Sequence, residues 1–315
     1  MNEMRILITA IGSMSAECAI QKLKEQGHFV VGCDIYPAEW HYETKLCDLF
    51  YQAPFATNEV EYVNFLINVC KDNHLKYIIP LTDLEIDIIN KNRKIFEDNT
   101  LILCMQSEEV LKVARDKYKL YKEFENDEKV PSVRTYIADN IPDNFLFPCI
   151  AKPYNGRSSE GLMRNVSREQ IATIGDKNNY IVQEQLSGNV FTVDYVRSSK
   201  YKADASVPRQ ELLRTKNGAG LTIRTCSDSI LINLTSYIGN RLNINGCVNM
   251  EFIYNKGYYY LIDINPRFSA GVAFSVISGY DMITNHLRCF NGERIDDPIA
   301  IDDRIIIKKY EEVFY

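Results

Sequence analysis

Hydrophobic and polar positions alternate in blocks along the first third of the chain. Short apolar runs such as RILITA, residues 5–10, predict buried strands, and the amphipathic stretches between them have the spacing of helices. Because the strands are apolar throughout, we expect an open parallel sheet covered by helices. The predicted strands are 5–10, 29–35, 77–80 and 100–104, and the predicted helices are 15–26, 59–73 and 84–96.

The pattern changes after a charged, helical stretch at residues 108–128. Pro131 marks the start of a new unit, because a proline disfavours helix in the residue before it. From residue 147 onward the predicted strands lie closer together, joined as hairpins, with one helix at 228–242. This predicts an α+β unit with antiparallel sheet. The chain therefore divides into a parallel α/β unit and an α+β unit, joined by the helical, charged stretch.

Composition narrows the class of protein. The net charge of −6 over 315 residues argues against a general nucleic-acid surface, although a local site for phosphates remains compatible with it. Nine cysteines without a C-x-x-C pair, and four histidines, indicate neither a zinc framework nor a disulfide scaffold, and favour a reducing cytoplasm. The chain shows no signal-peptide pattern and no apolar run near ~18 residues, so we expect no membrane association.

The stretch LIDINPRF carries the most distinctive chemistry. Asp263, Asn265 and Arg267 project to one face of an extended strand. The strand before it, VNMEFIY, carries Glu251, and a three-residue Asn-Lys-Gly hairpin loop would place Glu251 on that same face. Such an oxygen cluster suits a Mg²⁺ ion that also binds phosphate. Arg267 can form bidentate hydrogen bonds with a phosphate or a carboxylate. A hairpin with a solvated polar face is the alternative.

Two lysines and a flexible loop lie upstream. Lys152 stands on the apolar strand IAKP and needs an anion there, whereas Lys117 on a charged helix would normally be solvated. The loop after Lys152 could cover phosphates with its backbone N–H groups, although no Walker A sequence follows; a surface turn is the alternative. The loop residues concerned are Gly156, Ser158, Ser159 and Gly161.

A polar pair, Gln183 and Glu184, interrupts the apolar run YIVQEQL at its end. Backbone and side chain at such a position could pair with an adenine edge, and an exposed edge strand is the alternative.

In this order and spacing, these segments resemble the ATP-grasp superfamily, in particular its carbamoyl-phosphate-synthase-like and carboxylate–amine ligase branch. RILITAIGSMS and IIPLTDLEID are similar to its N-terminal domain, AKPYNGRSSEGL to its lysine strand and phosphate loop, and VQEQLSGNVFTVDYV to its adenine hinge. CVNMEF with LIDINPRFSAG resembles its paired metal strands, and is the most specific match. The resemblance implies a parallel α/β, Rossmann-like domain followed by an ATP-grasp fold of two α+β subdomains with antiparallel sheets. The implied domains are an N-terminal Rossmann-like domain, a helical linker with the small subdomain, and the C-terminal subdomain, at residues 1–107, 108–185 and 186–315.

The resemblance implies an ADP-forming ligase that uses ATP and Mg²⁺, with Mn²⁺ as an alternative ion. It would activate a carboxylate as an acyl phosphate and join it to an amine. The phosphates would be held by Lys117 and Lys152 under the loop of Gly156, Ser158, Ser159 and Gly161, and the adenine by Glu184 and Leu186.

The resemblance also assigns the metal and substrate sides. Glu251, Asp263 and Asn265 would bind one or two metal ions, and Asn265 and Arg267 would be catalytic. The basic segment VPRQELLRTKNGAG would lie near the second substrate, and a mobile exposed loop is the alternative. Its candidates for gripping an acidic substrate are Arg209, Arg214 and Lys216.

Two positions depart from the family pattern. Asp263 stands where the family usually has glutamate, and Val190 where this branch often has a glutamate for the ribose. Three other functions stay open: a non-catalytic ATP-binding module, a carbamate-phosphorylating relative, and an NAD(P)-binding protein. The last is suggested by TAIGSMSAEC and Asp34, but only Gly12 of the three fingerprint glycines is present. We expect small-molecule carboxylate and amine partners, no nucleic acid and no membrane, with a homodimer left open.

Overall fold

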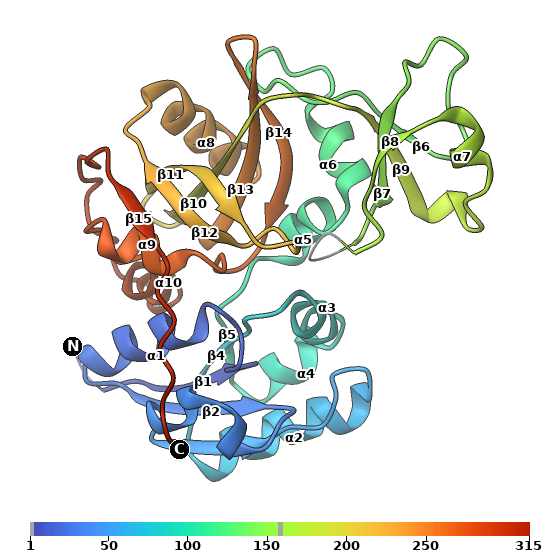
Figure 1. Cartoon of the computed structure of the whole chain (residues 1–315). Helices are drawn as coiled ribbons and strands as arrows, with labels where there is room; N and C mark the ends of the chain where they lie inside the picture. The colour runs from blue at the N-terminus through green and yellow to red at the C-terminus, as the bar shows by residue number, and fades with distance from the viewer. Residues whose placement is uncertain (1–2, 157–159) are drawn as a thin grey trace.

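The N-terminal third is a parallel five-stranded sheet with strand order β3-β2-β1-β4-β5 (Figure 1). The predicted open parallel sheet is confirmed, with one strand, β3, beyond the four predicted. The computed structural model describes residues 3–156 and 160–315. The strands are β1 (Arg5–Thr9), β2 (Phe29–Asp34), β3 (Leu49–Gln52), β4 (Tyr77–Ile79) and β5 (Ile102–Leu103). The helices around them are α1 (Ala16–Glu25), α2 (Glu59–Asp72), α3 (Asp83–Lys91) and α4 (Arg93–Asp98), with 3-10 turns η1 (Ala38–Trp40) and η2 (Tyr42–Lys45).

Both faces of this sheet are buried, which explains its unbroken apolar strands. On β1, Ile6 and Ile8 pack toward α1, while Leu7 packs on the opposite face against residues of α2 such as Leu66. Successive side chains of a strand point to opposite faces, so both parities must be apolar when both faces are covered.

Two predicted helices are each divided in two. The stretch 84–96 breaks at Asn92, whose side-chain amide donates to the carbonyl of Ile88 and to Glu59. The stretch 108–128 breaks at Asp116, whose carboxylate accepts from two backbone N–H groups of the next helix and so caps it. The resulting helices are α5 (Glu108–Ala114) and α6 (Lys117–Phe124).

A small antiparallel sheet with strand order β6-β9-β7-β8 follows. Strand β9 lies between β6 and β7, so the edge-strand alternative for this segment is wrong. The elements are β6 (Thr135–Ile137), β7 (Cys149–Pro153), β8 (Met163–Val166), β9 (Tyr180–Glu184), α7 (Arg168–Ala172) and η3 (Lys177–Asn179).

The C-terminal part is an antiparallel six-stranded sheet with strand order β14-β13-β10-β11-β12-β15. One face packs on α8, α5 and α6, and the other packs on α10 and, through it, on α1 of the N-terminal domain (Figure 1). A shared apolar core thus joins the N-terminal domain to the large sheet. The elements are β10 (Asn189–Ser198), β11 (Ala203–Arg214), β12 (Gly220–Thr225), β13 (Gly246–Asn255), β14 (Tyr258–Asn265), β15 (Ile305–Ile307), α8 (Ser229–Arg241), α9 (Val272–Ile277) and α10 (Met282–Asn291).

The hairpin between β13 and β14 differs from its prediction. Its loop has two residues, Lys256 and Gly257, both with positive φ (48° and 89°), as a type I′ turn requires, so the predicted three-residue loop is wrong. The even loop alone would pair Glu251 with Ile262. A register shift beside Glu251 leaves Ile262 without a partner and brings Glu251 opposite Asp263.

None of the helices formed by the described residues combines the length and apolar character that crossing a membrane requires. All nine cysteines are free thiols.

Candidate active site

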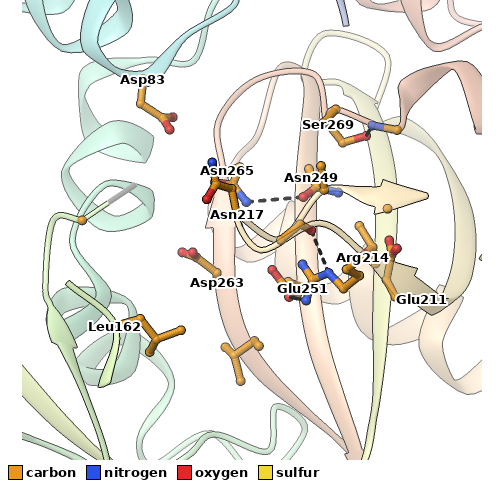
Figure 2. A pocket seen from close by; sticks show the side chains of 18 of the residues that line it. Asp83, Leu162, Glu211, Arg214, Asn217, Asn249, Glu251, Asp263, Asn265 and Ser269 are labelled. Carbon is orange, nitrogen blue, oxygen red and sulfur yellow. Dashed lines mark hydrogen bonds and ion pairs between the residues drawn. The ribbon is translucent and has the colours of Figure 1, made fainter. Parts of the chain in front are cut away.

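A cavity of about 770 Å³ lies where the small sheet, the large sheet and the N-terminal domain meet. Figure 2 shows part of its wall, with side chains of β13 and β14 directed inward. The small-sheet side includes Ile150, Lys152, Gln183, Glu184 and Leu186; the large-sheet side includes Arg214, Asn249, Glu251, Asp263 and Asn265; the N-terminal domain adds Ser13, Ser15, Thr82 and Asp83.

The structure brings the predicted oxygen ligands together. Glu251 on β13 is paired with Asp263 on β14, and Asn249 is paired with Asn265. The Asn265 amide donates to Asn249 Oδ1 at 3.3 Å (Figure 2). Asn249 was missed from the sequence, although it stands two residues before Glu251 on the same strand face and the alternation of the strand could have revealed it.

The ligand set contains two carboxylates and an amide. Within the described ranges, no group of three or more histidine, cysteine, aspartate or glutamate side chains could hold a metal. Mg²⁺ seldom needs such a cage, because it is usually held by one or two carboxylates plus substrate phosphates and water. Glu251, Asp263 and Asn265 therefore suit a magnesium ion that arrives with a phosphate.

Each of the two carboxylates forms an ion pair with a basic side chain of the protein. Arg214 Nη1 lies 2.6 Å from Glu251 Oε1, and Lys117 Nζ lies 3.3 Å from Asp263 Oδ2. Lys117 also donates to the carbonyl oxygen of Gly156 at 2.9 Å, which ties α6 to the start of the predicted phosphate loop.

Lys152 is half-buried on the small-sheet wall of the cavity. Burial lowers the pKa of its ammonium group to about 8, and the negative charge of Asp263 only partly offsets that effect. A lysine in this setting is stabilised by an anion beside it, as the sequence pattern indicated.

The predicted adenine residues lie at the end of β9. Glu184 and Leu186 line the cavity, and Glu184 Oε1 lies 3.8 Å from Arg134 Nη1. The neighbouring Gln183 is buried and donates to Thr135 Oγ1 at 2.8 Å, so its amide is already engaged.

Of the predicted phosphate loop, the structure describes the two ends. Gly156 lines the cavity, and Gly161 has a φ of 68°, a conformation that favours glycine. Ser158 and Ser159 lie outside the described residues.

Arg267 is held by a residue that the sequence did not reveal. Its Nε and Nη2 atoms donate to the two oxygens of Asp83 at 3.0 and 2.9 Å, and Asp83 belongs to α3 of the N-terminal domain. Burial would raise the pKa of Asp83, but the guanidinium groups of Arg267 and Arg115 outweigh it and lower that pKa. No local sequence pattern could have shown this pair, because its members are 184 residues apart.

The basic segment forms strand β11 and the turn to β12, so the mobile-loop alternative does not describe it. Arg209 is buried and bonded to Asp194 (2.7 Å), Ser269 (3.1 Å) and Glu211 (3.2 Å). Lys216 is exposed in the turn, whereas Arg214 lines the cavity.

In the N-terminal domain, side chains of the protein occupy the space beside the loop that resembles a dinucleotide-binding loop. The N–H of Gly12 donates to Asp34 Oδ2 at 2.9 Å, and the His41 ring covers Gly12 so closely that a Cβ there would lie 2.3 Å from it. His41 Nε2 also lies 3.3 Å from Asp34 Oδ1. A dinucleotide would need close contact with the backbone at Gly12 and a free carboxylate at Asp34. His41 blocks the first and the bond from Gly12 engages the second, which disfavours the NAD(P)-binding alternative.

Comparison with protein families agrees with this geometry. The sequence profile of the ATP-grasp domain matches residues 114–271, half of the chain. The chain belongs to the ATP-grasp family. Residues 6–104 of this ATP-grasp protein match the profile of the PylC-like N-terminal domain. The predicted family is confirmed.

One curated relative is the carbamoyl phosphate synthase large chain of Clostridium perfringens, 24% identical over 169 residues. The match covers 48% of this ATP-grasp protein but only 16% of the synthase chain.

Solved structures share the fold at low identity. The biotin carboxylase domain dimer of Hydrogenobacter thermophilus 2-oxoglutarate carboxylase, in complex with MgADP, ADP and bicarbonate, superposes with a TM-score of 0.77 at 16% identity, covering 94% of this chain and 71% of that one. N5-carboxyaminoimidazole synthetase of Staphylococcus aureus, complexed with ADP, gives 0.72 at 12% identity (96% and 82%). L-amino acid ligase of Bacillus licheniformis gives 0.71 at 13% identity (91% and 74%). These matches confirm the predicted fold class.

Proposed function

We propose that this ATP-grasp protein is an ADP-forming ligase that activates a carboxylate as an acyl phosphate and joins it to an amine. The observation that carries the proposal is the opposition of Glu251 and Asp263 across β13 and β14, facing Lys117 and Lys152 in one cavity. Carboxylates for a metal ion and ammonium groups for phosphates are the two charge sets that phosphoryl transfer requires.

The residues fit a complex of magnesium and ATP. Glu251, Asp263 and the amide oxygen of Asn265 would hold the ion, with phosphate oxygens completing its shell. When bound, Mg²⁺ would neutralise charge on the phosphate oxygens. The shorter side chain of Asp263 reaches less far than the usual glutamate, and its direct pairing with Glu251 keeps the two carboxylates close.

The nucleotide would lie between the two antiparallel sheets. Lys117 and Lys152 would hold the phosphates, covered by the loop that starts at Gly156 and includes Ser158, Ser159 and Gly161. Glu184 would accept a hydrogen bond from the exocyclic amine of adenine, and Leu186 would pack against the ring.

The substrate carboxylate would bind toward the N-terminal domain, beside Arg267 and Asn265. Its oxygen attacks the terminal phosphorus, ADP leaves, and the amine then attacks the acyl carbon and releases phosphate. Arg267, oriented by Asp83, would steady the carboxylate and the tetrahedral intermediate. Enclosure between domains would protect the acyl phosphate from water, and no protein nucleophile is needed.

Hydroxylamine trapping tests the proposal. Purified protein is incubated with MgATP, hydroxylamine and panels of carboxylic and amino acids, and both ADP and hydroxamate are measured. We expect equal amounts of the two with a substrate carboxylate, and neither from Lys152→Met. ADP release that needs no carboxylate and yields no hydroxamate, or the absence of magnesium-dependent ATP binding, would contradict the proposal; binding without turnover would indicate a non-catalytic ATP-binding module.

A further inference from the structure

Arg214 lies where a metal ion would meet Glu251. Its Nη1 atom is 2.6 Å from Glu251 Oε1, and its Nε atom donates to the carbonyl oxygen of Gly218 at 2.7 Å (Figure 2). The two side chains are 27% and 17% exposed, so the pair is partly shielded but still open to the cavity. Gly218 belongs to the turn between β11 and β12, whose residues also line the cavity.

The second carboxylate, that of Asp263, is neutralised by a lysine from the opposite wall of the cavity. Lys117 of α6 lies 3.3 Å from Asp263, so a cation from the large sheet and a cation from the helical segment neutralise the two metal-binding carboxylates. A free divalent ion must displace or repel these cations, because like charges at one carboxylate disfavour each other. A nucleotide brings phosphate oxygens, which bind a guanidinium group by charge-assisted hydrogen bonds.

We propose that Arg214 is a displaceable internal cation that couples metal binding to nucleotide binding: it neutralises Glu251 in the empty cavity and transfers to the phosphates when a nucleotide enters. The inference rests on the proposed function. It assigns Arg214 a role toward phosphate and metal, in place of a role toward an acidic substrate. The bond to Gly218 holds the guanidinium group beside Glu251 at the wall of the cavity.

The coupling has a signature that a merely structural role lacks. Removing the charge of Arg214 frees Glu251, so the metal alone binds more tightly. The same change removes a partner of the phosphates, so the metal-free nucleotide binds more weakly. In the variant, nucleotide promotes metal binding by a smaller factor than in the wild type. Metal promotes nucleotide binding by that same smaller factor, because linkage is reciprocal. A structural defect in the cavity would weaken both ligands.

The experiment measures binding without turnover. Mn²⁺ is titrated into the protein and free Mn²⁺ is followed by electron paramagnetic resonance, with and without adenylyl imidodiphosphate. Metal-free binding of the same nucleotide is measured by calorimetry in a chelating buffer. The variants are Arg214→Gln, Arg214→Lys, which keeps the charge, and Arg224→Gln, a matched charge removal on neighbouring β12 at an exposed position (49%). Circular dichroism checks that each variant is folded.

We expect Arg214→Gln to bind Mn²⁺ alone about tenfold more tightly, and the metal-free nucleotide about tenfold more weakly, each corresponding to about 1.4 kcal/mol. Arg214→Lys should stay near the wild type, and Arg224→Gln should equal it. If the wild type binds nucleotide with Mn²⁺ but Arg214→Gln has unchanged or weaker affinity for Mn²⁺ alone, the inference is wrong while the proposed function stands. If the wild type binds no nucleotide with Mn²⁺, the proposed function itself fails.

Discussion

Lys152 offers a direct test of how the cavity receives phosphate. Its pKa of about 8 means that about half of the side chains are neutral at pH 8, and about one tenth at pH 7. A triphosphate beside the ammonium group would move the pKa back toward its ordinary value of 10.5. Nucleotide binding near pH 8 should therefore take up protons from solution.

The magnitude follows from that pKa. Proton uptake should rise from roughly 0.1 per nucleotide at pH 7 to roughly 0.5 at pH 8 and 0.9 at pH 9, while the apparent Kd weakens about twofold at pH 8 and about tenfold at pH 9. Calorimetry with adenylyl imidodiphosphate at saturating magnesium, in buffers of different ionisation enthalpy, measures both quantities.

Lys152→Met is the decisive variant, because it removes the titrating group and leaves an apolar chain of similar length. It should bind nucleotide more weakly and show no rise in proton uptake from pH 7 to 9. Lys119→Met, on the exposed side of α6 (61% exposed), should behave as the wild type. If Lys152→Met keeps the wild-type proton uptake, the titrating group is elsewhere, and the assignment of Lys152 to the phosphates is refuted.

Two further predictions concern stability. Asp83→Asn should lower the free energy of unfolding by about 2–4 kcal/mol at pH 7, because it breaks a buried ion pair (Asp83 is 3% exposed), whereas Asp87→Asn at 47% exposure should cost much less. Since the pKa of Asp83 is depressed, the difference should be complete above the ordinary value of 3.8 and vanish as pH falls below it, in urea titrations. Gly188→Ala should cost about 1–3 kcal/mol, because its Cβ would lie 2.1 Å from the backbone oxygen of Tyr254. Gly175→Ala meets nothing within 4 Å and should be nearly neutral; equal melting temperatures for the two would contradict this account.

The parallel sheet could be predicted because its strands are buried on both faces and therefore carry unbroken apolar runs. Strand β3 was missed because it is an edge strand with partly exposed residues, so its LFYQ sequence lacks that signal. The two helix breaks were missed because Asn92 and Asp116 act through side-chain bonds to the backbone, which a hydrophobic period does not register.

In the candidate site, too, some residues could be predicted from the sequence and others could not. The candidate metal ligands Glu251 and Asp263 could be predicted because polar side chains on an apolar strand are costly to bury unless something satisfies them. The ion pairs around them could not be predicted. Arg214 reaches Glu251 from β11, two strands away in the sheet order, and Asp83 meets Arg267 across a domain boundary. Such contacts depend on sheet order and domain packing, which neither segment encodes locally.

The hairpin of β13 and β14 shows how a wrong premise led to a correct pairing. Strict alternation from Leu261, which packs in the core beneath α8, would turn Asp263 toward the same core. The unpaired Ile262 changes the parity of β14, so Tyr259, Leu261 and Ile264 all face the core while Asp263 and Asn265 face the cavity. The tight turn accommodates the strand twist, and the bulge supplies the odd residue that the loop lacks. An irregularity in the pairing thus lets one strand serve both the core and the site.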